Sequence, residues 1–140
     1  MVAYKSGGVN PPIKETIYKD LGLSFTPNPI TGKVSVLENE NAIIRALKNL
    51  IFTNKGEKLF RPLYGGNITA LLFENRDKFT EQSIKSRITK AIGTYEKRVS
   101  LLDVFVDSDP DDNDLNVTIV FRILSSNKIV ETTFQVERIR

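Results

Sequence analysis

The residues best suited to chemistry are Glu57 and Arg61, which lie four positions apart in the segment 53–66. The chain has no histidine and no cysteine, so it cannot build a Ser-His-Asp or Cys-His system, an ordinary zinc site or a disulfide. The arrangement that remains is the carboxylate pair of a glycosidase, with the acids about 5 to 10 Å apart and the pKa of one raised. Glu57 could be one acid, with Glu74 or Asp103 as the other.

Arg61 argues against that chemistry. A guanidinium near Glu57 should lower the pKa of the carboxyl group, and a general acid needs the opposite shift. We therefore predict a binding protein with no catalytic residues and no cofactor, and keep a muralytic, lysozyme-like glycosidase as the alternative.

The acidic turn after Asp107 is the candidate metal site. With Asp107 as the first position of a calcium loop, Asp112 replaces the glycine that the loop needs and Thr118 replaces its bidentate glutamate. A solvated hairpin turn explains the acids better, so we predict no metal.

Segment 53–66 also carries much apolar bulk, in Leu59, Phe60, Leu63 and Tyr64, together with three glycines and a proline. We expect this bulk to pack on the core and to carry Glu57 and Arg61 with it, joined as a salt bridge. A rigid connector and a partner-docking site are both consistent with the pattern.

Helical periodicity precedes this segment and follows it. Asn39 is the expected N-cap of a helix that residues 54–56 end, a short helix spans 67–74, and a third runs from an N-cap at Thr80 to about Lys97. The apolar face of the first helix is Ile43, Ile44, Leu47, Leu50 and Ile51.

The last 40 residues or so alternate with the period of strands, over about 101–107, 115–123 and 130–136. Short turns between them indicate an antiparallel meander. The fold class is therefore α+β, with helices packed on one face of a small antiparallel sheet that ends in a C-terminal three-stranded meander.

The N-terminal residues 1–16 are expected to be a flexible tail, and 17–140 a single domain. A net charge of +3 without clustered aromatics argues against nucleic acid. No apolar run is long enough to cross a membrane and the N-terminus lacks a signal-peptide core, so we expect a soluble protein in the cytoplasm where it is made.

The loop signature resembles a known family, the baseplate wedge proteins of contractile phage tails, which include tail sheath initiators of myoviruses and a related component of type VI secretion baseplates. The resemblance covers about Val34 to the C-terminus. Lys58 and Tyr64 stand where many members have arginine and phenylalanine. The matching residues are Thr53, Gly56, Glu57, Arg61, Pro62, Tyr64, Gly65, Leu71, Leu72, Phe73 and Glu74.

The resemblance implies a virion protein that binds other baseplate wedge proteins and the tail sheath protein, in about six copies per baseplate. It implies that the chain starts sheath polymerisation by accepting a strand at its C-terminal sheet. The alternative is that the chain is the equivalent subunit of a type VI secretion baseplate. The implied contacts with the wedge are Gly56, Glu57, Arg61, Pro62, Tyr64 and Gly65. Those for strand addition are Val130, Thr132, Phe134 and Val136.

Overall fold

The computed structural model describes residues 17–22, 24–73, 78–108 and 114–137. The predicted tail and most of the acidic turn lie outside these residues. The elements in chain order are β1 (Lys19–Leu21), β2 (Val36–Glu38), α1 (Glu40–Phe52), the 3₁₀ helix η1 (Thr69–Phe73), α2 (Lys78–Tyr95), β3 (Val99–Ser108), β4 (Asp114–Ile123) and β5 (Ile129–Glu137). The predicted α+β class is confirmed.

The C-terminal strands form an antiparallel sheet in the order β3-β4-β5, as predicted. Between β4 and β5 the register is unbroken from Asp114↔Glu137 to Arg122↔Ile129. The Ile123 amide donates to the Lys128 carbonyl oxygen (2.9 Å) and closes the hairpin. The pairing of β3 with β4 shifts at a bulge between Leu101 and Asp103.

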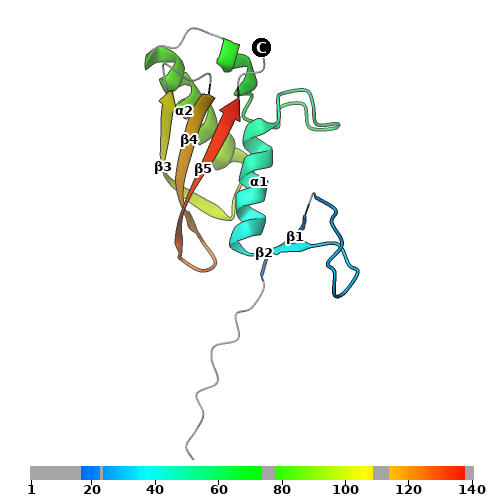
Figure 1. Cartoon of the computed structure of the whole chain (residues 1–140). Coiled ribbons are helices and arrows are strands. Elements are labelled where there is room, and N and C mark those ends of the chain that lie inside the picture. The colour runs from blue at the N-terminus through cyan, green and yellow to red at the C-terminus, as the bar shows by residue number, and fades with distance from the viewer. Residues whose placement is uncertain (1–16, 23, 74–77, 109–113, 138–140) are drawn as a thin grey trace, which may run out of the picture.

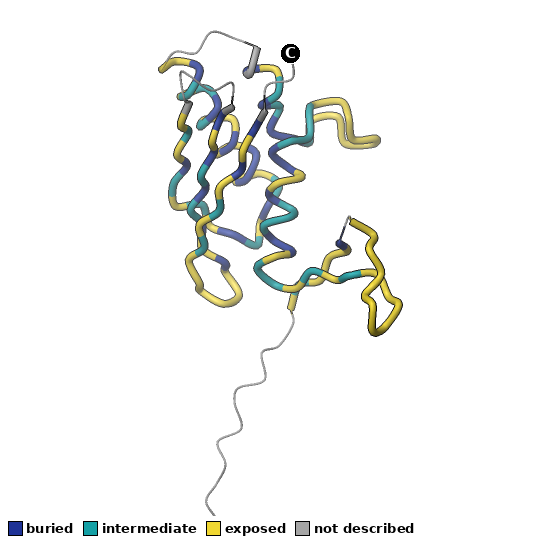
Figure 2. The backbone as a smooth tube through the Cα atoms, viewed as in Figure 1, coloured by how far each residue is buried: buried dark blue, intermediate teal, exposed yellow. Residues whose placement is uncertain are grey.

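Both α-helices cover the same face of this sheet (Figure 1). Their apolar stripes meet the inward side chains of the strands, which alternate with outward side chains that are mostly polar but include the exposed Leu102, Phe105 and Ile129. Figure 2 shows this buried layer between the helices and the sheet. The largest fully buried side chains are Phe121, Ile43, Leu47, Leu50, Ile51, Ile84, Ile88, Ile92, Ile119, Val104 and Val117.

Neither residue predicted as an N-cap acts as one through its side chain in the structure. The helix α2 begins at Lys78, so Thr80 lies inside its first turn and is buried. Asn39 does precede α1, but its side chain makes no cap hydrogen bond. Its amide oxygen instead accepts from the backbone N–H groups of Ile17 (2.9 Å) and Tyr18 (3.2 Å), which ties the N-terminal segment to the start of α1.

Strands β1 and β2 form a separate two-stranded antiparallel ribbon, which projects from the base of α1 (Figures 1 and 2). The sequence predicts extended segments here but not their pairing. Apolar side chains of the ribbon and its connecting loop are exposed, among them Leu21, Phe25 and Val36. In the described part of the chain, no helix is long and apolar enough to cross a membrane.

Candidate functional site: a projecting loop and a sheet edge

Residues 54–66, here called the projecting loop, extend into solvent beyond the end of α1 (Figures 1 and 2). The expectation that this segment packs on the core is wrong for most of it. Leu59 is 80% exposed, Phe60 100% and Leu63 71%. These three exposed apolar side chains make the loop a candidate surface for contact with another molecule.

Backbone hydrogen bonds hold the projecting loop in one shape. Gly56 N–H donates to the Pro62 carbonyl oxygen (2.8 Å), and so joins the outgoing and returning segments of the loop. Arg61 N–H donates to the Lys58 carbonyl oxygen (3.2 Å) and closes the tip, where Phe60 has a positive φ of 64°. The exposed side chains are therefore presented by an internally bonded backbone.

Glu57 is held by Asn54 and not, as predicted, by Arg61. Its carboxylate accepts from the Asn54 backbone N–H (2.8 Å) and from the Asn54 side-chain amide (2.7 Å). Among the described residues no ion pair joins Glu57 to Arg61. The two Asn54 hydrogen bonds lower the pKa of Glu57, so the predicted direction holds but its cause is different. Arg61 stays exposed.

The base of the loop is fixed to the core. Tyr64 is half-buried and its ring lies 5.0 Å from that of Tyr95, whose hydroxyl donates to the Leu63 carbonyl oxygen (2.8 Å). Gly65 is buried at a φ of 123°, and a Cβ there would collide with the Thr53 carbonyl oxygen. The glycine is thus required for the chain to return so close to the end of α1.

The residues predicted for wedge contact therefore divide into two groups. Gly56, Glu57, Arg61 and Pro62 lie on the exposed arm, whereas Tyr64 and Gly65 anchor it. The arm's most exposed apolar residues, Leu59 and Phe60, were absent from the predicted set, because apolar type alone indicates burial. Their neighbourhood of glycine, proline and charge is the signal that could have indicated a projecting tip.

The outer edge of β5 is the second candidate surface. Among the described strands β5 pairs with β4 alone. The four residues predicted for strand addition point their side chains inward: Phe134 and Val136 are buried, and Val130 and Thr132 are half-buried. Phe134 packs edge-on against Phe52 of α1, with ring centroids 6.5 Å apart.

The hydrogen-bond register decides which backbone groups of β5 face outward. Because Ile123 bonds to Lys128, alternation along the unbroken ladder directs the N–H and C=O groups of Val130, Thr132, Phe134 and Val136 toward β4. The backbone groups of the alternate residues, among them Ile129, Glu131 and Thr133, point to the open edge. An incoming strand would bond to these three, so the predicted four residues would line its inner side only.

At β3, the opposite edge strand of the sheet, one side chain of α2 reaches the strand. Lys85 Nζ lies 2.8 Å from the Asp103 carboxylate and 5.9 Å from the centroid of the Phe105 ring. The bulge beside Asp103 further distorts this strand. Bulges and lysines are the usual protection of an edge against pairing, and β5 has an unbroken ladder instead.

The two candidate surfaces are thus an arm that presents side chains and a strand edge that presents backbone. Comparison with known proteins narrows the class. The family model of baseplate wedge protein gp25 matches residues 37–128, which include α1, the projecting loop, α2 and most of the sheet. The chain belongs to this family.

Individual relatives agree in sequence and in fold. The chain is 33% identical over 92 residues to the baseplate wedge protein gp25 of Enterobacteria phage T4, an alignment that covers 63% of this chain and 70% of the phage protein. A crystal structure of a candidate tail lysozyme from Geobacter sulfurreducens has a TM-score of 0.69 and 23% identity, with 76% of this chain and 98% of that one covered.

A chain of the anti-feeding prophage baseplate has the same fold, with a TM-score of 0.59 and 23% identity over 88% of this chain and 87% of that one. That baseplate was determined with six-fold symmetry.

Proposed function

We propose that this protein is a structural component of a contractile tail baseplate, where it docks on other wedge proteins through the projecting loop and starts sheath polymerisation through the outer edge of β5. The observation that carries the proposal is the open, unbulged β5 ladder in a chain of the gp25 family. A strand from a sheath subunit would extend the sheet there by main-chain hydrogen bonds.

The projecting loop supports the docking half of the proposal. Its tip offers Leu59 and Phe60 as apolar anchors, with Arg61 beside them. Exposed aromatic and arginine side chains are the types that dominate binding energy at interfaces. The internal hydrogen bonds lower the entropy lost when the loop is ordered against a partner.

The presence of several copies in one baseplate supports the proposed role in sheath initiation. Copies fixed in a baseplate ring, about six if its symmetry follows the anti-feeding prophage, would present a ring of strand edges. Each sheath subunit would then gain from contacts with neighbours already held in register. A single copy in solution should bind sheath protein far more weakly.

A catalytic role has little support from the carboxylates that the structure describes. Hydrogen bonds from Asn54 lower the pKa of Glu57, and a hydrogen bond from Lys85 lowers that of Asp103. A glycosidase needs one acid whose pKa is raised. Glu74 lies outside the described residues. We propose that the protein has no muralytic activity.

The test is sheath assembly on baseplates prepared with and without this protein, mixed with purified tail tubes and sheath subunits and viewed by electron microscopy. Extended sheath should appear only when the protein is present. The docking half is tested with Arg61→Ala, which should reduce incorporation of the folded protein into baseplates. Equal sheath in both preparations would reject initiation, and normal incorporation of Arg61→Ala would reject the role given to that side chain.

A further inference from the structure

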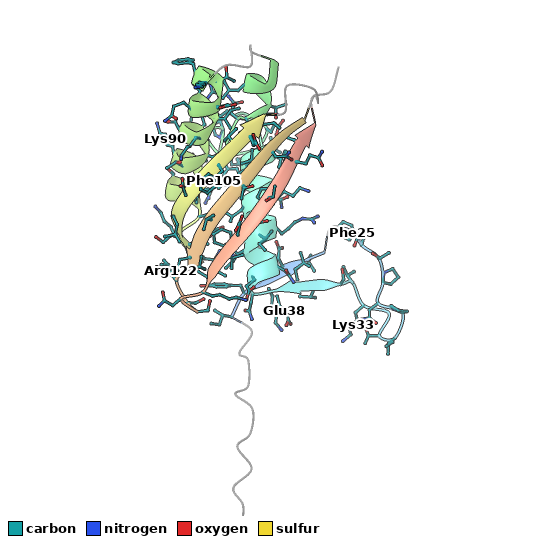
Figure 3. All side chains as sticks on the ribbon, turned by 60° about the vertical axis from the view of Figure 1, so that its left-hand side comes forward. Phe25, Lys33, Glu38, Lys90, Phe105 and Arg122 are labelled. Carbon is teal, nitrogen blue, oxygen red and sulfur yellow. The ribbon has the colours of Figure 1, made fainter. Side chains whose placement is uncertain are left out.

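A cavity of about 270 Å³ lies between α2 and the returning end of the projecting loop. Three basic side chains line it, Lys55 from the loop and Arg87 and Lys90 from α2, and no acidic residue does. Figure 3 shows Lys90 on α2, well away from the ribbon that carries Lys33. Cations that share a cavity without a counter-charge repel one another, and an anion placed among them relieves that repulsion.

We propose that this cavity, called the cationic pocket, binds a carboxylate side chain of the wedge protein on which the loop docks. The inference rests on the proposed docking function and specifies the partner's chemistry: an acidic segment with a glutamate or aspartate in position to enter the pocket. Contact at the loop tip would then be apolar, and contact at its base would be ionic.

The pocket is shaped in advance for such a group. Arg87 is oriented by a hydrogen bond from its Nη1 to the Asn67 carbonyl oxygen (3.0 Å), which fixes one side of a fork that matches a carboxylate. Leu63, Ala91 and Tyr95 supply apolar wall for the methylene groups of an acidic side chain. The hydrogen bond from Tyr95 to Leu63 keeps that wall in place.

Nearby acids do not supply the missing charge. The Glu57 carboxylate accepts two hydrogen bonds from Asn54, and Glu96 forms a 2.6 Å ion pair with Arg98. Two other basic residues are engaged elsewhere: Lys85 of α2 pairs with Asp103, and Lys97, just beyond the helix, donates to the Gly93 carbonyl oxygen. Arg87 and Lys90 thus converge with Lys55 on one small volume, whereas a nucleic-acid site spreads its cations along a phosphate backbone.

The first experiment titrates the full-length protein with poly-glutamate and follows backbone amide signals by NMR. Signals of Gly65, Gly66 and Ala91 should shift for the native protein, and these shifts should be lost in the double variant Arg87→Gln, Lys90→Gln. Absence of shifts at these amides would overturn the carboxylate pocket. A short duplex DNA that shifts the same signals at lower concentration would overturn it in favour of a phosphate ligand.

The second experiment measures affinity for baseplate wedges that lack this protein, at low and high salt. The double variant should bind about tenfold more weakly at low salt and lose most of the salt dependence. The matched control is Lys33→Gln, Arg122→Gln, which removes the same charge from two exposed sites distant from the pocket (Figure 3) and should change affinity less than about twofold.

The outcomes separate the inference from the function on which it rests. If native protein binds wedges and the pocket variant binds as tightly as the control, the pocket assignment is wrong and docking stands. If native protein shows the poly-glutamate shifts but does not bind wedges, the carboxylate site stands and the docking function fails.

Discussion

The projecting loop and the outer edge of β5 differ in what they offer a partner. The loop presents side chains, since Leu59, Phe60 and Arg61 are exposed on a backbone whose own groups bond to one another. The β5 edge presents backbone, since the inward side chains of Phe134 and Val136 are already buried in the core. One surface should thus be sensitive to side-chain identity, whereas the other should tolerate most side chains and fail when its backbone donors are removed.

The largest effect is expected from Glu131→Pro. This substitution removes an outward N–H from β5 but leaves the bonds to β4, because proline is tolerated on an edge strand. Sheath growth should fall by more than about tenfold, with stability changed by no more than about 1 kcal/mol. Electron microscopy of assembled tails and urea denaturation measure the two effects.

Two controls accompany that variant. Glu131→Ala keeps the N–H and should support normal sheath growth. Thr132→Pro removes an N–H that points to β4 and should cost about 3 kcal/mol of stability. If Glu131→Pro grows sheath normally, backbone recognition at this edge is rejected.

At the base of the loop, Gly65→Ala should destabilise the protein by about 3 kcal/mol, because the added Cβ meets the Thr53 carbonyl oxygen and the φ of 123° is strained for alanine. Gly56→Ala is the matched control: its φ is 89°, but the added Cβ has open space, so about 1 kcal/mol is expected. Urea denaturation compares them. Equal losses would mean that the close approach at Gly65 is unimportant.

At the tip, Phe60→Ser should weaken wedge binding by about tenfold and change stability by less than about 0.5 kcal/mol, since the side chain is fully exposed. Phe25→Ser, which removes an exposed aromatic from the ribbon region, is the control and should leave wedge affinity nearly unchanged (Figure 3). Unchanged binding by Phe60→Ser would end the claim that the loop acts through its side chains.

The smallest effect concerns the pKa of Glu57, which should rise toward its ordinary value of 4.5 in Asn54→Ala and stay lowered in Arg61→Ala. Because a lowered carboxyl pKa favours the folded loop, this stabilisation is complete above 4.5 and is lost as pH falls through the lowered pKa. NMR titration of the Glu57 side chain measures both variants. If the pKa of Glu57 rose in Arg61→Ala but not in Asn54→Ala, the salt bridge predicted from the sequence would be supported instead of the Asn54 hydrogen bonds.

The regular elements could be predicted from the sequence because each has a periodic pattern. Ile43, Leu47 and Leu50 follow the helical period in α1, and Val117, Ile119 and Phe121 follow the strand period in β4. These side chains share a core, so the predicted fold class agreed with the structure. The register of β5, which assigns the outward groups to Glu131 and Thr133, depends on hydrogen bonds that no pattern of types records.

The sequence marks the loop as a candidate site but does not predict its geometry. Leu59 and Phe60 have the composition of a core segment, and only the tight bonding of the loop to itself directs them to solvent. Opposite charge predicts that Glu57 pairs with Arg61. In the structure the four-residue turn 54–57 brings Asn54 to Glu57 instead. The cationic pocket joins Lys55 to Arg87 and Lys90, which are more than 30 positions away along the chain.

The most direct test of the account is a cryo-electron microscopy structure of the baseplate with the first sheath ring bound. The account predicts an added strand bonded to the backbone of Ile129, Glu131 and Thr133, with the projecting loop seated on a neighbouring wedge protein. An unoccupied β5 edge beneath an ordered sheath ring would contradict it.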